Sequence, residues 1–145
     1  MNQTDTIKLE VPAKHKYLNV VGACITSILE RMEDIAESAT VAYGVELAVH
    51  ETCTNIVEHA YAGISGLIHM SITIEQSPKR LVIELKDNGR SFDPAKVPEP
   101  NLEESQVNGY GLFLMHQLMD RVDYYPQSGQ NRWYLVKNLE SRIAS

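Results

Sequence analysis

The segment 51–61 combines an apolar stripe and a polar stripe on one predicted helix, which limits how the chain can pack. At ~100° per residue, Asn55, Glu58 and His59 lie within about 80° of Glu51. The opposite stripe consists of Val49, Cys53, Ile56 and Ala60. Such a helix buries its apolar stripe against a core and turns the polar stripe toward water or a polar ligand. A solvated face is the commoner outcome for this pattern alone, so the other motifs must decide between the two.

The spacing of apolar residues elsewhere predicts the rest of the secondary structure. Helices are expected at about residues 14–37, 41–61 and from residue 112 onward, and strands at about 6–11, 70–74, 81–85, 121–126 and 132–138. Three helices covering a mixed, mostly antiparallel sheet form a two-layer α+β sandwich. The whole chain, residues 1–145, is most simply a single domain.

The composition indicates a soluble cytoplasmic protein. The net charge of −6 argues against a nucleic-acid surface, and no basic cluster opposes that conclusion. No apolar run approaches the ~20 residues needed to cross a bilayer, and the N-terminus lacks the apolar core of a signal peptide. Cys24 and Cys53 both fall at apolar helical positions, so we expect reduced, buried thiols rather than a disulfide or a zinc site.

A second motif, Asp87-Asn-Gly89, ends a predicted strand. Asp87 has the same parity as Leu81, Ile83 and Leu85, so its side chain is expected to point toward the buried layer. A carboxylate in that position needs a hydrogen-bond partner. A plain turn-forming role for the aspartate is the competing interpretation.

A third motif, Asn108-Gly109-Tyr110-Gly111-Leu112, opens the last helix. Glycines at a helix start let a ligand approach the backbone, and the first-turn amides form an anion site. Tight helix packing would also explain them.

The segment 88–108 before this motif holds three prolines and almost no periodicity. A loop of that length inside a compact domain is often a lid, and we expect a lid at about residues 93–108.

The order of the motifs is more specific than any one of them. Glu-x-x-x-Asn on a helix is followed by Asp-x-Gly ending a strand, a lid-length loop, and Gly-x-Gly-Leu opening a helix. This combination resembles the GHKL ATP-binding superfamily, which includes histidine kinases, gyrase and Hsp90, and more closely its anti-sigma-factor serine/threonine kinases. Finer matches lie in residues 55–61, 87–94, 109–120 and 129–137, so the resemblance covers about residues 10–140. It implies the histidine-kinase-like ATP-binding fold.

The resemblance also implies binding of ATP together with Mg²⁺. Asn55 would coordinate the Mg²⁺ that bridges the ATP phosphates, which suits a hard cation that prefers oxygen ligands. Glu51, one helical turn earlier, would be the catalytic base toward an attacking hydroxyl. Asp87 would accept a hydrogen bond from the adenine amine, and Gly89 would let the base lie against the backbone.

Other positions of the same family motifs would contact the nucleotide as well. By resemblance, Gly109 and Gly111 would bring backbone amides to the phosphates. The matching motif positions also include Phe92, Asp93, Tyr110 and Leu112. His59 lies farther along the polar stripe, where a structural histidine and a ligand contact are equally compatible with the sequence.

The chain departs from the family pattern at three places. Ser91 stands where the family often has a second glycine, and Tyr110 stands where it often has arginine. The segment 97–108 contains Glu99, Glu103 and Glu104 but no lysine or arginine. Phosphoryl transfer relies on cations around the γ-phosphate, so slow turnover or a role in binding alone stays open.

Three functions fit the resemblance to different degrees. The leading one is a protein-serine/threonine kinase that regulates by partner switching: it holds a sigma factor or another effector and phosphorylates a STAS-type antagonist. The first helix and strand 6–11 offer a surface for a homodimer or for the sigma factor. The alternative is a nucleotide-gated module that sequesters a partner without phosphoryl transfer. A catalytic fragment of a histidine kinase fits poorly, because the first helix carries no histidine in a phosphoacceptor setting and His15 lies at its start.

Overall fold

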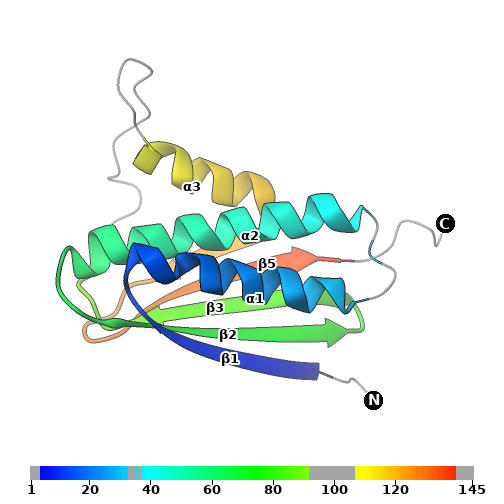
Figure 1. Ribbon diagram of the computed structural model, residues 1–145, viewed down its shortest axis with the longest axis horizontal. Coiled ribbons are helices and arrows are strands. Elements are labelled where there is room, and N and C mark those ends of the chain that lie inside the picture. Colours follow the sequence, from blue (N-terminus) through cyan, green and yellow to red (C-terminus); the bar gives the residue numbers. More distant parts are fainter. Residues whose placement is uncertain (1–3, 33–34, 36, 92–106, 140–145) are drawn as a thin grey trace.

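The computed structural model describes residues 4–32, 35, 37–91 and 107–139, which form an antiparallel sheet covered on one face by helices (Figure 1). The sheet has five strands in the order β1-β2-β3-β5-β4, and each of its four neighbouring pairs is antiparallel. The strands are β1 (Thr4–Pro12), β2 (Leu67–Gln76), β3 (Lys79–Asp87), β4 (Arg121–Tyr125) and β5 (Asn131–Asn138). The predicted α+β sandwich is confirmed. Within the described residues the sheet is antiparallel throughout rather than mixed.

Three α-helices lie on the same face of this sheet (Figure 1). They are α1 (Leu18–Glu30), α2 (Ser38–Asn55) and α3 (Val107–Leu118), and a short 3₁₀ turn, His15–Tyr17, leads into α1. A buried threonine hydroxyl helps to join two of the helices, because Thr52 Oγ1 lies 2.8 Å from Met115 Sδ on α3. None of the helices in the described part of the chain is long and apolar enough to cross a membrane.

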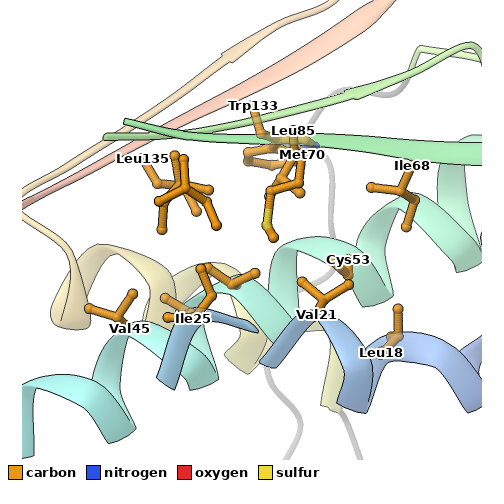
Figure 2. Close-up of a cluster of buried hydrophobic side chains, with 14 of the residues drawn as sticks. Leu18, Val21, Ile25, Val45, Cys53, Ile68, Met70, Leu85, Trp133 and Leu135 are labelled. Carbon is orange, nitrogen blue, oxygen red and sulfur yellow. The ribbon is translucent and has the colours of Figure 1, made fainter. Parts of the chain in front are cut away.

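The core fills the space between the sheet and the helices. Across three strands, Met70 is paired with Leu85 and Leu85 with Trp133, and all three side chains are buried. Figure 2 shows these side chains pointing from the sheet toward Val21 and Ile25 on α1. This row follows from the period-2 alternation of the strands, which sends every second side chain to the helical side. The same parity carries Asp87, at the end of β3, into the buried layer.

The first helix is shorter than its apolar spacing predicts. We expected a helix over about residues 14–37, but α1 ends at Glu30. Tight i→i+3 bonds close it, with the backbone N–H of Arg31 and of Met32 donating to carbonyls three residues earlier. Met32 and Ile35 still pack against the core. The apolar spacing therefore marked residues that reach the core and missed where the helical hydrogen bonds stop.

The second predicted helix, at about 41–61, changes type within its length. After Asn55, residues Ile56–Tyr61 form a π-helix, and the backbone N–H of Ala62 donates to the Val57 carbonyl five residues earlier. The step of ~100° per residue that placed the polar stripe holds only for α-helical geometry, so it applies up to Asn55. The predicted apolar stripe is confirmed, since Val49, Cys53, Ile56 and Ala60 are all buried. π-Turns occur frequently at functional sites.

Candidate functional site

The end of α2, the end of β3 and the start of α3 meet at one end of the molecule (Figure 1). The backbone joins the first two, because Arg90 N–H donates to the Ala60 carbonyl at 2.8 Å. Helix α3 joins them through Gly111, where an added Cβ atom would lie 2.7 Å from Glu51 Oε2. All three motifs singled out in the sequence are thus brought together, although about 60 residues separate the first from the last.

Asp87 lies at the bottom of this region and is 1% exposed, as its strand parity predicts. Its Oδ1 atom accepts two hydrogen bonds, from Gly89 N–H at 2.9 Å and from Asn131 Nδ2 at 3.0 Å. Its Oδ2 atom is buried and has no partner among the described residues. Burial raises the pKa of the Asp87 carboxyl above its usual value, while the donors from Asn131 and Gly89 act in the opposite direction. The carboxylate therefore has one oxygen that can accept a hydrogen bond for which the described residues supply no donor.

Gly89 follows Asp87 where the strand meets the helix. A Cβ atom at Gly89 would lie 2.5 Å from the Ala60 carbonyl oxygen, closer than real Cβ atoms come. Glycine is thus required here for the close approach of the two backbone segments. This is a packing reason, and it comes in addition to the predicted contact of Gly89 with a nucleotide base.

Glu51 is half-buried on α2 and lies against Gly111 of α3. Partial burial raises the pKa of its carboxyl; His50 lowers it and Glu58 raises it further. A carboxylate with a raised pKa is a stronger base than one in open water. Gly111 is buried and has no side chain that would displace the Glu51 carboxylate. The backbone amide of Gly111 as a phosphate donor stays a prediction.

Asn55 is the last residue of α2 and is 3% exposed. Its Nδ2 atom is buried without a hydrogen-bond partner among the described residues. A buried amide normally has its hydrogen bonds satisfied. Asn55 and Asp87 therefore each have a buried polar atom without a hydrogen-bond partner among the described residues, in the same region of the molecule. This pattern is expected when a polar ligand completes the site.

The other predicted site residues have different positions. Leu112 is half-buried and packs against the core. His59 is half-buried, and its backbone carbonyl accepts a hydrogen bond from Arg90 Nε at 2.9 Å. Gly109 and Tyr110 belong to the first turn of α3. Phe92, Asp93 and the predicted lid up to residue 106 lie outside the described residues.

Two residues that sequence reasoning did not assign to the site also hold it together. Asn131, the first residue of β5, is fully buried and donates to Asp87. The Tyr61 hydroxyl donates to the Leu67 carbonyl at 2.6 Å and accepts from Asn88 N–H at 2.9 Å. Both lie within stretches that match the family, but no single-residue pattern distinguishes a buried amide or phenol of this kind from an ordinary core residue.

This geometry provides three chemical elements. A buried carboxylate offers one acceptor oxygen, and the Nδ2 atom of a buried amide lacks a partner among the described residues. A half-buried carboxylate with a raised pKa lies one helical turn from that amide. Over most of the chain, at residues 11–137, the sequence matches the Histidine kinase-like ATPase domain family. The chain belongs to this family. The predicted relation to the GHKL superfamily is thereby confirmed, and a family of ATPase domains uses ATP.

Curated relatives match along most of their own length. The Serine-protein kinase RsbW of Bacillus pumilus is 32% identical over 139 residues, covering 89% of this chain and 84% of the relative. The RsbW of Oceanobacillus iheyensis is 34% identical over 138 residues, with the same coverage. The similarity therefore extends well beyond the three short motifs.

Solved structures share the fold at lower identity. The RsbU and RsbW domains of Rv1364c from Mycobacterium tuberculosis match with a TM-score of 0.69 and 16% identity, covering 97% of this chain and 35% of that one. The histidine kinase domain of the blue-light-activated kinase EL346 from Erythrobacter litoralis matches with a TM-score of 0.56 and 20% identity, covering 89% of this chain and 62% of that one. These matches confirm the histidine-kinase-like arrangement of helices on a sheet.

Proposed function

We propose that this chain is an ATP-dependent protein-serine/threonine kinase that acts by partner switching. The observation that carries the proposal is the buried Oδ2 atom of Asp87, which has no partner among the described residues, in a site where the basic carboxylate of Glu51 lies one helical turn from the buried amide of Asn55. Relatives named serine-protein kinase at 32–34% identity support the same reaction. Residues 1–145 would act as one domain, in the cytoplasm.

Asp87 is the residue that would select adenine. Its free Oδ2 atom accepts a hydrogen bond, so it suits the exocyclic amine of adenine and rejects a carbonyl oxygen at the same position. A hydrogen bond to a charged acceptor inside a protein contributes about 1.5–3 kcal/mol. That range is enough to decide which base is bound. Gly109 and Gly111 would place α3 beside the phosphates.

Asn55 is the residue that would hold Mg²⁺, through its side-chain oxygen. No group of three or more His, Cys, Asp or Glu side chains suited to a metal ion occurs in the residues that the structure describes. This agrees with Mg²⁺ chemistry, because Mg²⁺ usually keeps several waters and takes one or two protein ligands together with substrate phosphates. When bound, the ion would neutralise phosphate charge during transfer.

Glu51 would act as the general base of the transfer. The hydroxyl oxygen of a serine or threonine on the antagonist attacks the γ-phosphorus, the bond to the ADP oxygen breaks, and the hydroxyl proton passes to Glu51. The raised pKa of Glu51 strengthens it as a proton acceptor. Gly111 keeps the facing surface of α3 free of a side chain that would push the carboxylate away.

The proposed partners are a sigma factor or another effector, and an antagonist of the STAS class. The test is to incubate the purified protein with ATP, Mg²⁺ and the STAS-type protein encoded nearest to it, and to weigh the antagonist by mass spectrometry. A mass gain of one phosphate on a serine or threonine supports the kinase, and E51Q should remove it. A homodimer through α1 and β1 would be seen in the same preparation by light scattering.

The alternative function, a nucleotide-gated binding module, is favoured by one feature of the sequence. The segment 97–108 holds three glutamates and no lysine or arginine, whereas phosphoryl transfer uses cations near the γ-phosphate. ATP-dependent binding of the antagonist without any mass gain would establish this module in place of the kinase.

A further inference from the structure

The side chain of Asn131 connects the end of β3 and the turn after it to the start of β5 through five hydrogen-bond contacts. It is fully buried at the start of β5. Its Nδ2 atom donates to Asp87 Oδ1 at 3.0 Å, to the Gly89 carbonyl at 3.0 Å and to the Arg90 carbonyl at 3.1 Å. Its Oδ1 atom accepts from the Ser91 hydroxyl and, at 3.3 Å, from the backbone N–H of Gln127.

These contacts allow only one orientation of the amide. Its NH₂ group faces three oxygen acceptors, and its carbonyl oxygen faces a backbone N–H and a hydroxyl. The flipped amide would set an oxygen against three oxygens, so the network fixes the assignment. Ser91 contributes to this hydrogen-bond network, and it stands where the family often has glycine. Here its hydroxyl supplies a donor that a glycine cannot provide.

The consequence for Asp87 is a carboxylate whose two oxygens are unequal. Gly89 N–H and Asn131 Nδ2 both donate to Oδ1, which leaves Oδ2 as the acceptor without a partner in the part of the chain that the structure describes. A partial rotation of the carboxylate would break both bonds, and a half-turn would only exchange two equivalent oxygens. The same Asn131 amide binds the Gly89 and Arg90 carbonyls, so it holds the turn after Asp87 as well as the carboxylate.

We propose that Asn131 is the positioning residue of the base site: it fixes the Asp87 carboxylate so that Oδ2 alone is presented to the exocyclic amine of a purine. This inference rests on the proposed function, because it concerns how the same site recognises adenine. Asn131 would not touch the nucleotide itself. It acts through Asp87, and its removal should therefore affect recognition of the amine and not of the rest of the ligand.

The test compares ATP with purine riboside triphosphate, which lacks the 6-amino group, by titration calorimetry in the presence of Mg²⁺. Asn131→Ala should weaken ATP binding by roughly tenfold or more, as expected for loss of a hydrogen bond to a charged acceptor. The affinity for the analogue should stay within about twofold of the wild-type value, since the analogue has no amine that donates to Oδ2. The matched control is Asn138→Ala, the same substitution at the exposed end of β5, which should change neither affinity.

Equal weakening for ATP and for the analogue would show that Asn131 is only structural, and unchanged ATP affinity would equally overturn the proposal. If Asn131→Ala does not fold, Ser91→Ala serves instead, because Ser91 is exposed and donates to the Asn131 amide. A smaller loss of affinity that is confined to ATP then supports the proposal. An equal loss of affinity for ATP and the analogue, or no loss for either, overturns it.

A measurement on the free protein separates this inference from the proposed function. In ligand-free protein the pKa of the Asp87 carboxyl, followed by NMR, should rise in Asn131→Ala, since the ionised form loses a donor. An unchanged pKa would refute the positioning role whatever the ligand results. Failure of the unmodified protein to bind ATP would refute the nucleotide function instead, and the pKa would then decide the role of Asn131 alone.

Discussion

Asp87→Asn should make the protein more stable while it weakens nucleotide binding. In the wild type, Oδ1 has two donors and Oδ2 has no partner among the described residues. An unpaired buried polar atom costs about 1–3 kcal/mol, and more when it is charged. In the variant, the amide oxygen keeps both donors, while a neutral NH₂ group replaces the charged oxygen. Because that NH₂ group still lacks an acceptor, only part of the cost is recovered, and we expect a gain of about 1 kcal/mol.

The gain should depend on pH in a definite direction. Burial raises the pKa of Asp87 in the folded state, so the native protein binds a proton more readily than the unfolded chain does. Wild-type stability therefore falls as the pH rises from the ordinary value of 3.8 through the raised folded pKa. Asparagine does not titrate, and so Asp87→Asn should be the more stable protein at pH 7 and should lose this advantage below pH 3.8.

Thermal unfolding followed by circular dichroism measures this difference. A gain of about 1 kcal/mol corresponds to a rise in Tm of about 3 °C for a chain of this size. The matched control is Asp5→Asn on the exposed strand β1, which should leave Tm unchanged at both pH values. Calorimetry on the same samples should show ATP affinity reduced by roughly tenfold or more, since an NH₂ group cannot accept from adenine. A variant less stable than wild type at pH 7 would refute the reasoning, because the ionised carboxylate would then favour the folded state.

Three further predictions concern the residues proposed to act on the phosphates. Glu51→Gln should lower the rate of phosphate transfer by roughly 10²-fold, with an unfolding free energy within about 1 kcal/mol of wild type. Because burial raises the Glu51 pKa, the wild-type rate should already decline at pH values above 4.5, the ordinary carboxyl pKa, as the pH is lowered. A rate that stays constant in that range would exclude Glu51 as the base. Asn55→Ala should abolish Mg²⁺-dependent ATP binding in calorimetry, whereas Asn19→Ala on the exposed face of α1 should not; equal affinities would remove Asn55 from the site. Gly111→Ala should slow transfer roughly tenfold or more, since its Cβ would press on Glu51 Oε2, although alanine favours a helix by up to about 1 kcal/mol. Gly44→Ala is the control at a second helical glycine, where the added Cβ would lie 3.3 Å from the flexible end of Leu118 and not near Glu51. It should affect transfer far less, and a similar loss there would point to a general effect on folding.

The layer arrangement and the direction of Asp87 could be predicted from the sequence because both depend on local periodicity. Alternation with period 2 assigns each strand residue to a face, and the rows from β2 through β5 obey it. The parity shared by Leu81, Ile83, Leu85 and Asp87 was therefore sufficient to predict a buried carboxylate. Hydrophobic spacing is a weaker guide to helix ends. It extended α1 beyond Glu30 and passed over the change to a π-helix after Asn55.

Contacts between distant segments were outside the reach of such patterns. Gly111 appeared in the sequence as a residue that frees the backbone for a ligand, whereas in the structure it lies against Glu51, 60 residues earlier in the chain. Gly89 likewise lies against the Ala60 carbonyl, so that an added Cβ atom would collide with it. Gly89 is needed because an added Cβ would collide with backbone, whereas a Cβ at Gly111 would displace the end of the Glu51 side chain. Only the packed fold reveals which partner each glycine meets.

Asn131 shows why the sequence could propose candidate site residues but not the hydrogen bonds that connect them. A buried asparagine at the start of a strand has no sequence signature, and its value lies in five contacts that come from residues 87–91 and from Gln127. Those contacts also explain a departure from the family. Ser91 stands where the family often has a second glycine, and its hydroxyl donates to the Asn131 side chain. If the network sets the orientation of Asp87, Ser91 and Asn131 should depend on each other, so the double variant should lose no more ATP affinity than Asn131→Ala alone.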